Sequence, residues 1–452
     1  MTNSPRGWIS RIGLPIASSA LTLAIVVALG LAATQSAQAQ TFTVLHKFTG
    51  PPDGANPYAG LLRNAAGNLY STTYEGGDGT GCENYGCGTV FRMDTSGEET
   101  VLYSFTGGTD GGRPLANLIM DAAGNLYGTT SSGGTENCDP SCGTVYELKK
   151  NGGLTVLHSF AGFQSDGCEP YAGLLRDKAG NLYGTTLGCG AYSFGTVFRV
   201  DTTGTETVLY NFTGGRDGGG PSAGLISDKS GNLYGTTFDG GAYEYGVVFK
   251  LTPSSGGWKE SVLYSFAGGA NGGYTDAGLI FDKAGNLYGS TLRGGAYDAG
   301  MVFKLSPSTK GAWNIRVLYS FTGNNDGGSP RASVIFDKSG NLYGTTQVGG
   351  YYQYGTVFEL KPTHKGQWKE SVLWDFTGGA DGANPYAGLI EDGDGNPVSY
   401  THLVGTDGIE PRRAPTCRRR TNPPAIPRPD GARAIRRSSA GTRRSWFRGR
   451  SR

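Results

Sequence analysis

A repeated unit constrains the fold of this chain more than any other feature of its sequence. The block Gly-Asn-Leu-Tyr-(Gly/Ser)-(Thr/Ser)-Thr occurs in six complete copies, and its first two residues occur once more. Its asparagines lie 51 to 57 residues apart, at Asn68, Asn125, Asn181, Asn232, Asn286, Asn341 and Asn396. Two further blocks, Val-Leu-x-x-Phe and Gly-x-Val-(Phe/Tyr), keep the same period. Three independent blocks on one period indicate tandem structural repeats.

Each unit predicts four short strands. In the fifth repeat these are 277–281, 286–291, 301–305 and 316–321, with an Asp-Lys-Ala-Gly turn after the first. Short runs of Val, Leu, Tyr, Phe and Thr between glycines favour a β meander. Four antiparallel strands per unit are typical of a propeller blade. We therefore predict an all-β fold, a β-propeller, over 40–397. A β-solenoid is the alternative, but its repeats are typically shorter.

The ends of the repeat region suggest how the ring closes. A Val-Leu-x-x-Phe-type segment, 44–48, precedes the first full unit, and a first strand at 387–390 follows the sixth. We expect six complete blades and a partial seventh, to which 44–48 adds the closing strand. The middle strands of that seventh blade are interrupted where the repeat pattern breaks after Asn396.

Both ends of the chain lie outside the repeats. We interpret residues 1–39 as a signal peptide, because Arg6 and Arg11 precede an apolar run and Ala37-Gln-Ala39 offers a cleavage site. The alternative is an N-terminal membrane anchor. Residues 398–452 read as a disordered basic tail of off-frame or adapter-derived origin, since Val-Ser-Tyr-Thr-His-Leu interrupts a repeat. A basic arm that binds nucleic acid is the alternative.

The net charge of +2 hides two opposite contributions. The tail from Val404 carries fourteen arginines and three acids, and the leader carries two arginines. The repeat region is left acidic, at −11. An acidic domain argues against nucleic acid as a partner. We expect no transmembrane segment in the mature chain.

The repeat resembles a known family. Asp-x-x-Gly-Asn-Leu-Tyr-Gly-Thr-Thr, Gly-Gly, Tyr-Gly-Thr-Val-Phe and Val-Leu-Tyr-Ser-Phe follow one another in the order of the GloVer tandem repeats of bacterial "choice-of-anchor" proteins, over about residues 43–396. The pattern is more distantly similar to NHL and gluconolactonase-like propellers. The resemblance implies an exported protein, often held at the cell surface by a variable C-terminal anchor, with no established enzymatic activity.

Six of the seven cysteines form plausible pairs. Cys82 with Cys87, Cys138 with Cys142, and Cys168 with Cys189 each lie in loops, whereas Cys417 lies in the tail. An even number of cysteines in an exported chain predicts disulfides. Metal ligation is the weaker alternative, because no histidine lies near them.

Two loop types are expected on one face of the propeller, where they form a candidate ligand-binding face. The first carries the acids Asp53, Asp110, Asp166, Asp217, Asp326 and Asp381, with Asn271 at the fifth position. The second carries the aromatics Tyr192, Tyr243, Tyr245, Tyr297, Tyr352 and Tyr354. Tyrosine rings and carboxylates suit carbohydrate binding. The structural alternative is that Asp-Gly is turn chemistry repeated with the fold.

Catalysis has little support in the sequence. His46 and His158 lie inside Val-Leu-x-x-Phe-type segments, where other repeats carry Tyr or Trp, so we interpret them as strand residues. No catalytic motif, metal site or cofactor is predicted. We expect an extracellular, periplasmic or surface propeller that binds polysaccharide or a surface protein. The alternatives are a hydrolase or lyase acting on polysaccharide or lactone, and a purely structural surface repeat.

Overall fold

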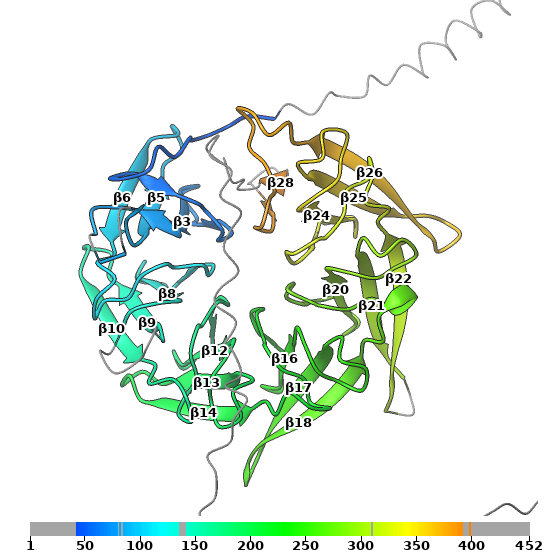
Figure 1. The fold of residues 1–452 in the computed structure, drawn as a ribbon, viewed down its shortest axis with the longest axis horizontal. Helices are drawn as coiled ribbons and strands as arrows, with labels where there is room; N and C mark the ends of the chain where they lie inside the picture. Colours follow the sequence, from blue (N-terminus) through cyan, green and yellow to red (C-terminus); the bar gives the residue numbers. More distant parts are fainter. Residues whose placement is uncertain are drawn as a thin grey trace, which may run out of the picture. The chain divides into compact units, whose positions relative to one another are not determined.

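Six four-stranded antiparallel sheets surround a central axis as the blades of a β-propeller (Figure 1). This computed structural model describes residues 42–79, 81–82, 85–134, 142–308 and 311–391, together with the backbone of 397–398. The predicted signal peptide, nearly all of the predicted tail, Cys138 and Asp392 lie outside the described residues. Within the described part of the chain, no helix has the length and apolar character needed to cross a membrane.

Every blade has its strands in chain order, from the innermost to the outermost. Blade 1 contains β2 (Leu62–Arg63), β3 (Leu69–Thr73), β5 (Thr89–Met93) and β6 (Glu99–Ser104). Blade 2 contains β7 (Ile119–Met120), β8 (Leu126–Thr130), β9 (Thr144–Leu148) and β10 (Leu154–Ser159). Blade 3 contains β11 (Leu175–Arg176), β12 (Leu182–Thr186), β13 (Thr196–Val200) and β14 (Glu206–Asn211).

The second half repeats this order with longer outer hairpins. Blade 4 contains β15 (Ile226–Ser227), β16 (Leu233–Thr236), β17 (Val247–Ser254) and β18 (Gly257–Ser265). Blade 5 contains β19 (Ile280–Phe281), β20 (Leu287–Thr291), β21 (Met301–Pro307) and β22 (Trp313–Ser320). Blade 6 contains β23 (Ile335–Phe336), β24 (Leu342–Thr346), β25 (Thr356–Pro362) and β26 (Trp368–Asp375). Outside the blades lie β1 (Gly54–Ala55), which pairs with β4 (Glu75–Gly76), and a short 3-10 turn, η2 (Gly269–Asn271).

The first turn of each blade explains the Asp-x-x-Gly-Asn motif. In blade 2, Asp121 Oδ1 accepts the backbone N–H groups of Ala123 and Asn125, both at 2.9 Å. Its Oδ2 accepts the Asn125 side chain at 3.0 Å and the Tyr127 hydroxyl at 3.1 Å. Gly124 has φ +89°, which a residue with a Cβ rarely adopts. These acids therefore shape a turn, as we predicted.

The Thr-Thr pair at the end of the Leu-Tyr-Gly-Thr-Thr block connects neighbouring strands and neighbouring blades. Thr185 Oγ1 donates to the Ala223 carbonyl of the next blade at 3.3 Å, and Thr186 Oγ1 bonds Thr196 Oγ1 of β13 at 2.8 Å. The glycine before the pair leaves space for an aromatic ring, because a Cβ at Gly184 would lie 2.5 Å from Phe198 Cζ. The repeated polar residues thus satisfy buried groups where the inner strands meet.

The core at each blade junction is an edge-on aromatic pair. The phenylalanine that follows the outer strand of one blade packs against the third-strand aromatic residue of the next blade, and both are fully buried. The ring centroids lie 5.0 to 5.4 Å apart in Phe105–Tyr146, Phe160–Phe198, Phe212–Phe249, Phe266–Phe303 and Phe321–Phe358. Edge-on geometry at this spacing is the favoured arrangement of aromatic rings.

The N-terminal segment continues this arrangement across the seam between blades 6 and 1. Figure 1 shows the segment, in blue, along the outer side of the gap between these two blades. Phe48 lies 5.3 Å from Phe91 of blade 1, and Phe42 lies 5.7 Å from Phe376, which follows blade 6. Two short strands, β27 (Ile390–Glu391) and β28 (Pro397–Val398), form the partial seventh blade.

The prediction that 44–48 forms a strand is wrong in detail. These residues are not assigned to any strand, and Val44 and Leu45 are exposed. A strand needs a hydrogen-bonding neighbour, and the expected neighbour is the third strand of the seventh blade. Among the described residues β27 pairs only with β28, so the segment is held by side-chain packing rather than by a β ladder.

Tyr146 provides a test of the aromatic junction. It occupies a position where the other five blades carry Phe, and its hydroxyl is buried without a hydrogen-bond partner among the described residues. Because an unsatisfied buried hydroxyl costs about 1–3 kcal/mol, we expect Tyr146→Phe to raise the free energy of unfolding by about 1 kcal/mol in urea titrations. Phe198→Tyr is the matched reverse change and should destabilise. A stability loss in Tyr146→Phe would contradict this packing account.

Candidate functional site at the inner loop face

The two predicted loop types lie on the same face of the propeller. The loop after each outer strand forms an isolated bridge with the second loop type of the next blade, as in Gly112–Ser132 and Gly273–Arg293. The Cys168–Cys189 disulfide joins the same two loop types, and Cys82–Cys87 closes one loop. These two predicted pairings are confirmed. Cys142 is also disulfide-bonded, but Cys138 is not among the described residues.

The loop aspartates bond to their own loops. Asp110 accepts the Thr106 backbone N–H at 2.8 Å, the Thr106 hydroxyl, and the Tyr103 hydroxyl at 3.0 Å. Asp217 and Asp326 repeat these bonds, and Asp381 accepts Trp374 Nε1 at 3.2 Å. Burial, followed by the hydrogen bond to Asp110, raises the pKa of Tyr103 to about 12. This geometry supports the structural alternative for the aspartates.

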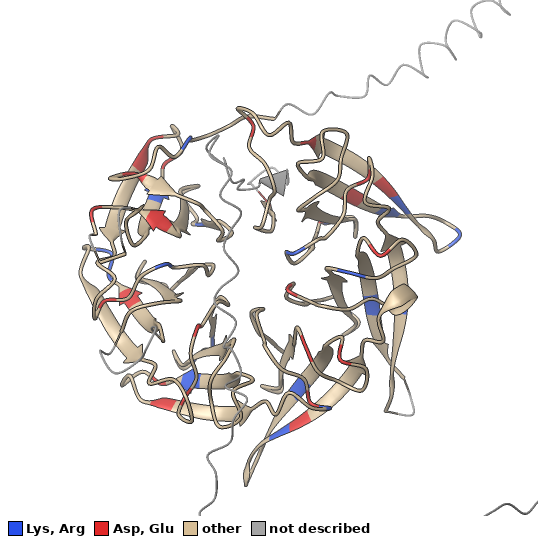
Figure 2. Cartoon of the chain, viewed as in Figure 1, with Lys and Arg blue, Asp and Glu red and all other residues tan. Residues whose placement is uncertain are grey.

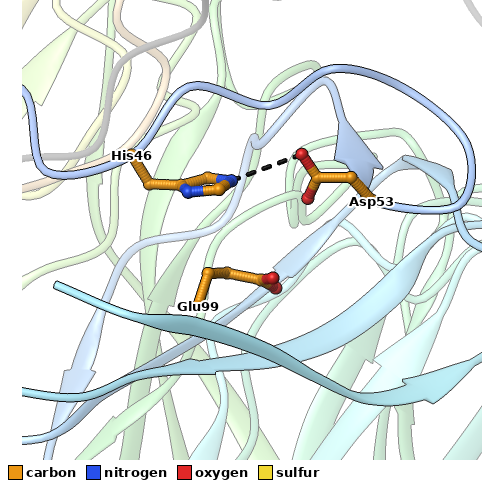
Figure 3. A group of neighbouring side chains, drawn as sticks. All are labelled: His46, Asp53 and Glu99. Carbon is orange, nitrogen blue, oxygen red and sulfur yellow. Dashed lines mark hydrogen bonds and ion pairs between the residues drawn. The ribbon is translucent and has the colours of Figure 1, made fainter.

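Two of these aspartates bond histidine instead of tyrosine. His46 Nε2 lies 3.3 Å from Asp53 Oδ2, and His158 Nε2 lies 2.7 Å from Asp166 Oδ2. A glutamate from the outer strand of the following blade completes each group, namely Glu99 in the first (Figure 3) and Glu206 in the second. Sequence reasoning treated the two histidines as ordinary strand residues and missed both groups.

The loop tyrosines fall into two classes. Tyr192, Tyr243 and Tyr297 are 57 %, 58 % and 64 % exposed. Tyr245 instead packs on the following loop, where a Cβ at Gly268 would lie 2.6 Å from its ring. Tyr354 packs in the same way on Gly378, while Tyr352 is half exposed. Five of the six predicted tyrosines are therefore exposed, and Tyr245 is not.

A third set of residues, which we name the axial ring, lies where the repeats differ from one another. Each repeat carries the pattern x-Pro-x-Ala, or a close variant, just before its innermost strand, and the residues at the two x positions vary among the copies, although the second is Tyr in three of the seven. Innermost strands surround the axis (Figure 1). From these positions the axial ring includes Tyr58, Arg113, Glu169, Tyr171, Ser222, Asp276, Arg331 and Tyr386, and we add Tyr74, which follows β3 and contacts Tyr58.

Contacts join these residues from one repeat to the next. Asp276 accepts the Ser222 hydroxyl at 3.1 Å and Arg331 Nη1 at 2.5 Å. The Arg331 guanidinium lies 4.9 Å from the centroid of the Tyr386 ring, which lies 5.0 Å from that of Tyr58.

The contacts continue on the other side of the seam. The Tyr58 ring lies 5.5 Å from Tyr74, and the Arg113 guanidinium lies 5.6 Å from the Tyr74 centroid. Arg113 in turn acts electrostatically on Tyr171 of the third repeat. One polar and aromatic set therefore extends from Ser222 through the seam to Tyr171.

Burial governs the ionisation of the axial ring. It is the largest cause that raises the pKa values of Tyr58, Tyr171 and Glu169. Burial also raises the pKa of Asp276, although Arg331 opposes the shift. The tyrosine hydroxyls therefore stay neutral at physiological pH, when they can both donate and accept hydrogen bonds.

The backbone at the ring is unusual. The residue before the proline, or its equivalent, has a positive φ in all seven repeats, yet only Gly220 is glycine there. Arg113, for example, has φ +55° and is fixed because its N–H donates to Cys87 O at 2.7 Å and its carbonyl accepts the Ser131 N–H at 3.2 Å. Non-glycine residues in this region cost about 1–3 kcal/mol and cluster at functional sites.

A small pocket lies between loops of blades 4 and 5. Tyr245, Tyr274, Arg293 and Asp298 line it together with loop glycines. The Tyr245 and Tyr274 rings lie 5.3 Å apart, and Tyr274 is two residues from Asp276. Aromatic rings and charged side chains thus occur together in this pocket.

Glu260 of β18 permits a pH test of a blade junction. Burial, and then repulsion from Asp217, raises its pKa to about 7, and its buried Oε1 has no hydrogen-bond partner among the described residues. A carboxyl group whose pKa is higher in the folded state favours folding below the unfolded pKa, and that contribution is lost as the pH rises through the folded pKa.

We therefore expect Glu260→Gln to leave unfolding unchanged near pH 4.5 but to stabilise the protein at pH 8. With a discount for solvent screening, the gain is on the order of 1 kcal/mol. Asp201→Asn is the control of opposite sign, because hydrogen bonds from Thr203 and Thr205 lower the Asp201 pKa. Urea titrations at the two pH values provide the measurement, and equal effects of Glu260→Gln at both would contradict the assignment.

Several solved structures are similar to this chain. A putative gluconolactonase is 17% identical, with 64% of this chain and 86% of that chain covered and a TM-score of 0.38. A putative 6-phosphogluconolactonase from Bacteroides uniformis is 15% identical, with 71% and 85% covered and a TM-score of 0.46. A fungal alcohol oxidase in complex with copper is 15% identical, with 80% and 73% covered and a TM-score of 0.50. At 15% identity the likeness to the alcohol oxidase concerns the fold alone.

The sequence comparisons identify the family. No curated protein matches the chain significantly. The Gloeobacter/Verrucomicrobia repeat, however, matches residues 29–242 and 221–409, which together span most of the chain and all of the described blades. The chain is a member of the Gloeobacter/Verrucomicrobia repeat family.

Proposed function

We propose that this propeller is a non-catalytic binding module that holds a carbohydrate at the axial ring. One observation carries the proposal: the positions at which the repeats differ meet around one axis and carry aromatic and hydrogen-bonding side chains. Structural residues repeat with the fold, whereas a ligand without the symmetry of the propeller requires different side chains in different repeats. The axial ring meets that requirement, and the loop aspartates do not.

The chemistry of the ring suits a sugar. Tyr58, Tyr74, Tyr171 and Tyr386 offer aromatic faces that can stack on the C–H surface of a pyranose. Arg331, Asp276 and Ser222 offer donors and acceptors for its hydroxyl groups. Acidic and basic residues are mixed around the blades in Figure 2, which does not favour a polyanion such as nucleic acid.

One observation favours the catalytic alternative. Burial raises the pKa values of Glu75 and Glu169, and a carboxyl group with a raised pKa can serve as a general acid towards a polysaccharide or a lactone. The Asn56 side chain donates a hydrogen bond to the Glu75 carboxyl group at 2.5 Å, and we interpret Asn56 as the residue that positions Glu75. A glycan-binding experiment separates the binding module from the enzyme, because turnover of a bound glycan would support the hydrolase or lyase alternative.

A glycan array followed by calorimetry tests the binding site. We expect Tyr58→Ala and Tyr386→Ala to weaken binding of the best glycan at least about tenfold, the equivalent of about 1.4 kcal/mol. Tyr297→Ala removes an exposed ring of the outer loops and should leave the affinity unchanged. Circular dichroism checks the fold of each variant. No binding to any glycan or cell-wall fraction would favour a protein ligand or a purely structural role instead.

We also propose that the chain is exported. Two disulfides in the described loops support this, because such bonds persist mainly in oxidising compartments. N-terminal sequencing of the protein recovered from the culture medium and periplasm should give a mature chain that begins at Gln40. Recovery of the intact N-terminus in the cytoplasm would contradict export by a cleaved signal peptide.

A further inference from the structure

Two groups of side chains at the outer blade junctions have the composition of a metal site. We name them the seam cluster (His46, Asp53 and Glu99) and the junction cluster (His158, Asp166 and Glu206). The seam cluster joins the N-terminal segment to β6 of blade 1, and the junction cluster joins β10 of blade 2 to β14 of blade 3. Both are built from equivalent repeat positions, and neither lies at the axial ring.

The distances suit one small cation per cluster. One ligand atom from each side chain lies within 4.8 Å of the other two. The imidazole and aspartate atoms are 3.3 Å apart in the seam cluster and 2.7 Å apart in the junction cluster. Tetrahedral Zn²⁺, with bonds of about 2.0–2.2 Å, places neighbouring ligands about 3.3 Å from one another. A shift of the glutamate towards the other two side chains, and in the junction cluster a small separation of His158 from Asp166, would complete such a site.

The aspartates are already oriented for this role. Asp166 Oδ1 accepts the backbone N–H groups of Ala161 at 2.8 Å and Gly162 at 3.3 Å, while Oδ2 faces His158. In the seam cluster Asp53 Oδ1 accepts the Gly54 N–H at 2.7 Å. Outer hydrogen bonds of this kind fix a ligating carboxylate and are a regular part of protein metal sites.

The glutamate of each cluster belongs to a repeated feature of the blade junctions. The Oε1 atoms of Glu99 and Glu206 are buried and have no hydrogen-bond partner among the described residues, and the same holds for Glu260 and Glu370 at the junctions with tyrosine. Leaving a carboxylate oxygen buried and unpaired is costly. A divalent cation would satisfy that oxygen and balance the charge of the two carboxylates in each cluster.

The chain contains its own reference sites. At two other junctions the same Asp and Glu positions are kept, but a tyrosine replaces the histidine, as in Tyr210, Asp217 and Glu260. A neutral tyrosine hydroxyl donates to the aspartate and offers no imidazole nitrogen, the ligand that zinc favours. The histidine is therefore the residue that separates a metal-binding junction from a hydrogen-bonded one.

We propose that the seam cluster and the junction cluster each bind one divalent transition-metal cation of the Zn²⁺ class, which clamps neighbouring parts of the propeller together. Each site has three protein ligands, and water would supply the fourth. The seam cation holds the N-terminal segment on blade 1, where the described residues provide no β ladder to do so.

Equilibrium dialysis with ZnCl₂ and metal analysis of the untagged full chain tests the proposal. We expect two Zn²⁺ per chain, one in His46→Tyr, one in His158→Tyr and none in the double variant. Tyrosine is chosen because the chain already accommodates it beside Asp217, so each variant should fold, as circular dichroism can verify. Zinc should also raise the Tm of the wild-type chain but not that of the double variant.

A gain-of-site variant makes the test independent of any loss of folding. Tyr210→His places an imidazole beside Asp217 and Glu260 and should raise the stoichiometry from two to three. Retention of both ions in the double histidine variant, or no zinc binding by the wild-type chain at micromolar metal, would overturn the proposal. Neither outcome bears on carbohydrate binding, because the axial ring contains none of these residues.

Discussion

The propeller depends on the buried phenylalanine that follows each outer strand and packs edge-on against the next blade. This contact has nearly the same geometry at five junctions between complete blades, with ring centroids 5.0 to 5.4 Å apart. It explains why Val-Leu-x-x-Phe and Gly-x-Val-(Phe/Tyr) keep one period, since each phenylalanine needs its aromatic partner one repeat later. At the seam Phe48 and Phe42 supply the missing rings without forming a strand.

Much of this architecture could be predicted because it repeats. Strand order, the Asp-x-x-Gly-Asn turn and the shared loop face follow from local rules that each repeat obeys in the same way. The two disulfides, which occur in individual repeats, follow from the placement of their cysteines in loops on that face. The segment 44–48 could not be predicted as well, because its conformation depends on a neighbouring strand rather than on its own residues. The sequence of this segment indicates that it packs at the seam, but not whether it forms backbone hydrogen bonds with a neighbouring strand.

The candidate site was missed for the opposite reason. The loop aspartates are shared by the repeats, and they bond to their own loops. The axial ring appears only when the repeats are compared for their differences, at the residues around the proline. That signal was present in the sequence, in the change from Tyr58 to Ser222, Asp276 and Arg331. The His–Asp–Glu clusters needed the structure, because Glu99 and Glu206 come from the following blade.

Family membership and the propeller fold leave the ligand to be identified from the site itself, since unrelated functions use this fold. The central claim is that the ligand contacts the axial ring. Hydroxyl-radical footprinting with mass spectrometry measures it directly, because tyrosines lie at both candidate surfaces. With the best-binding glycan present, Tyr58, Tyr74 and Tyr386 should be protected while Tyr192, Tyr243 and Tyr297 are not. Protection of the outer tyrosines alone would contradict the account.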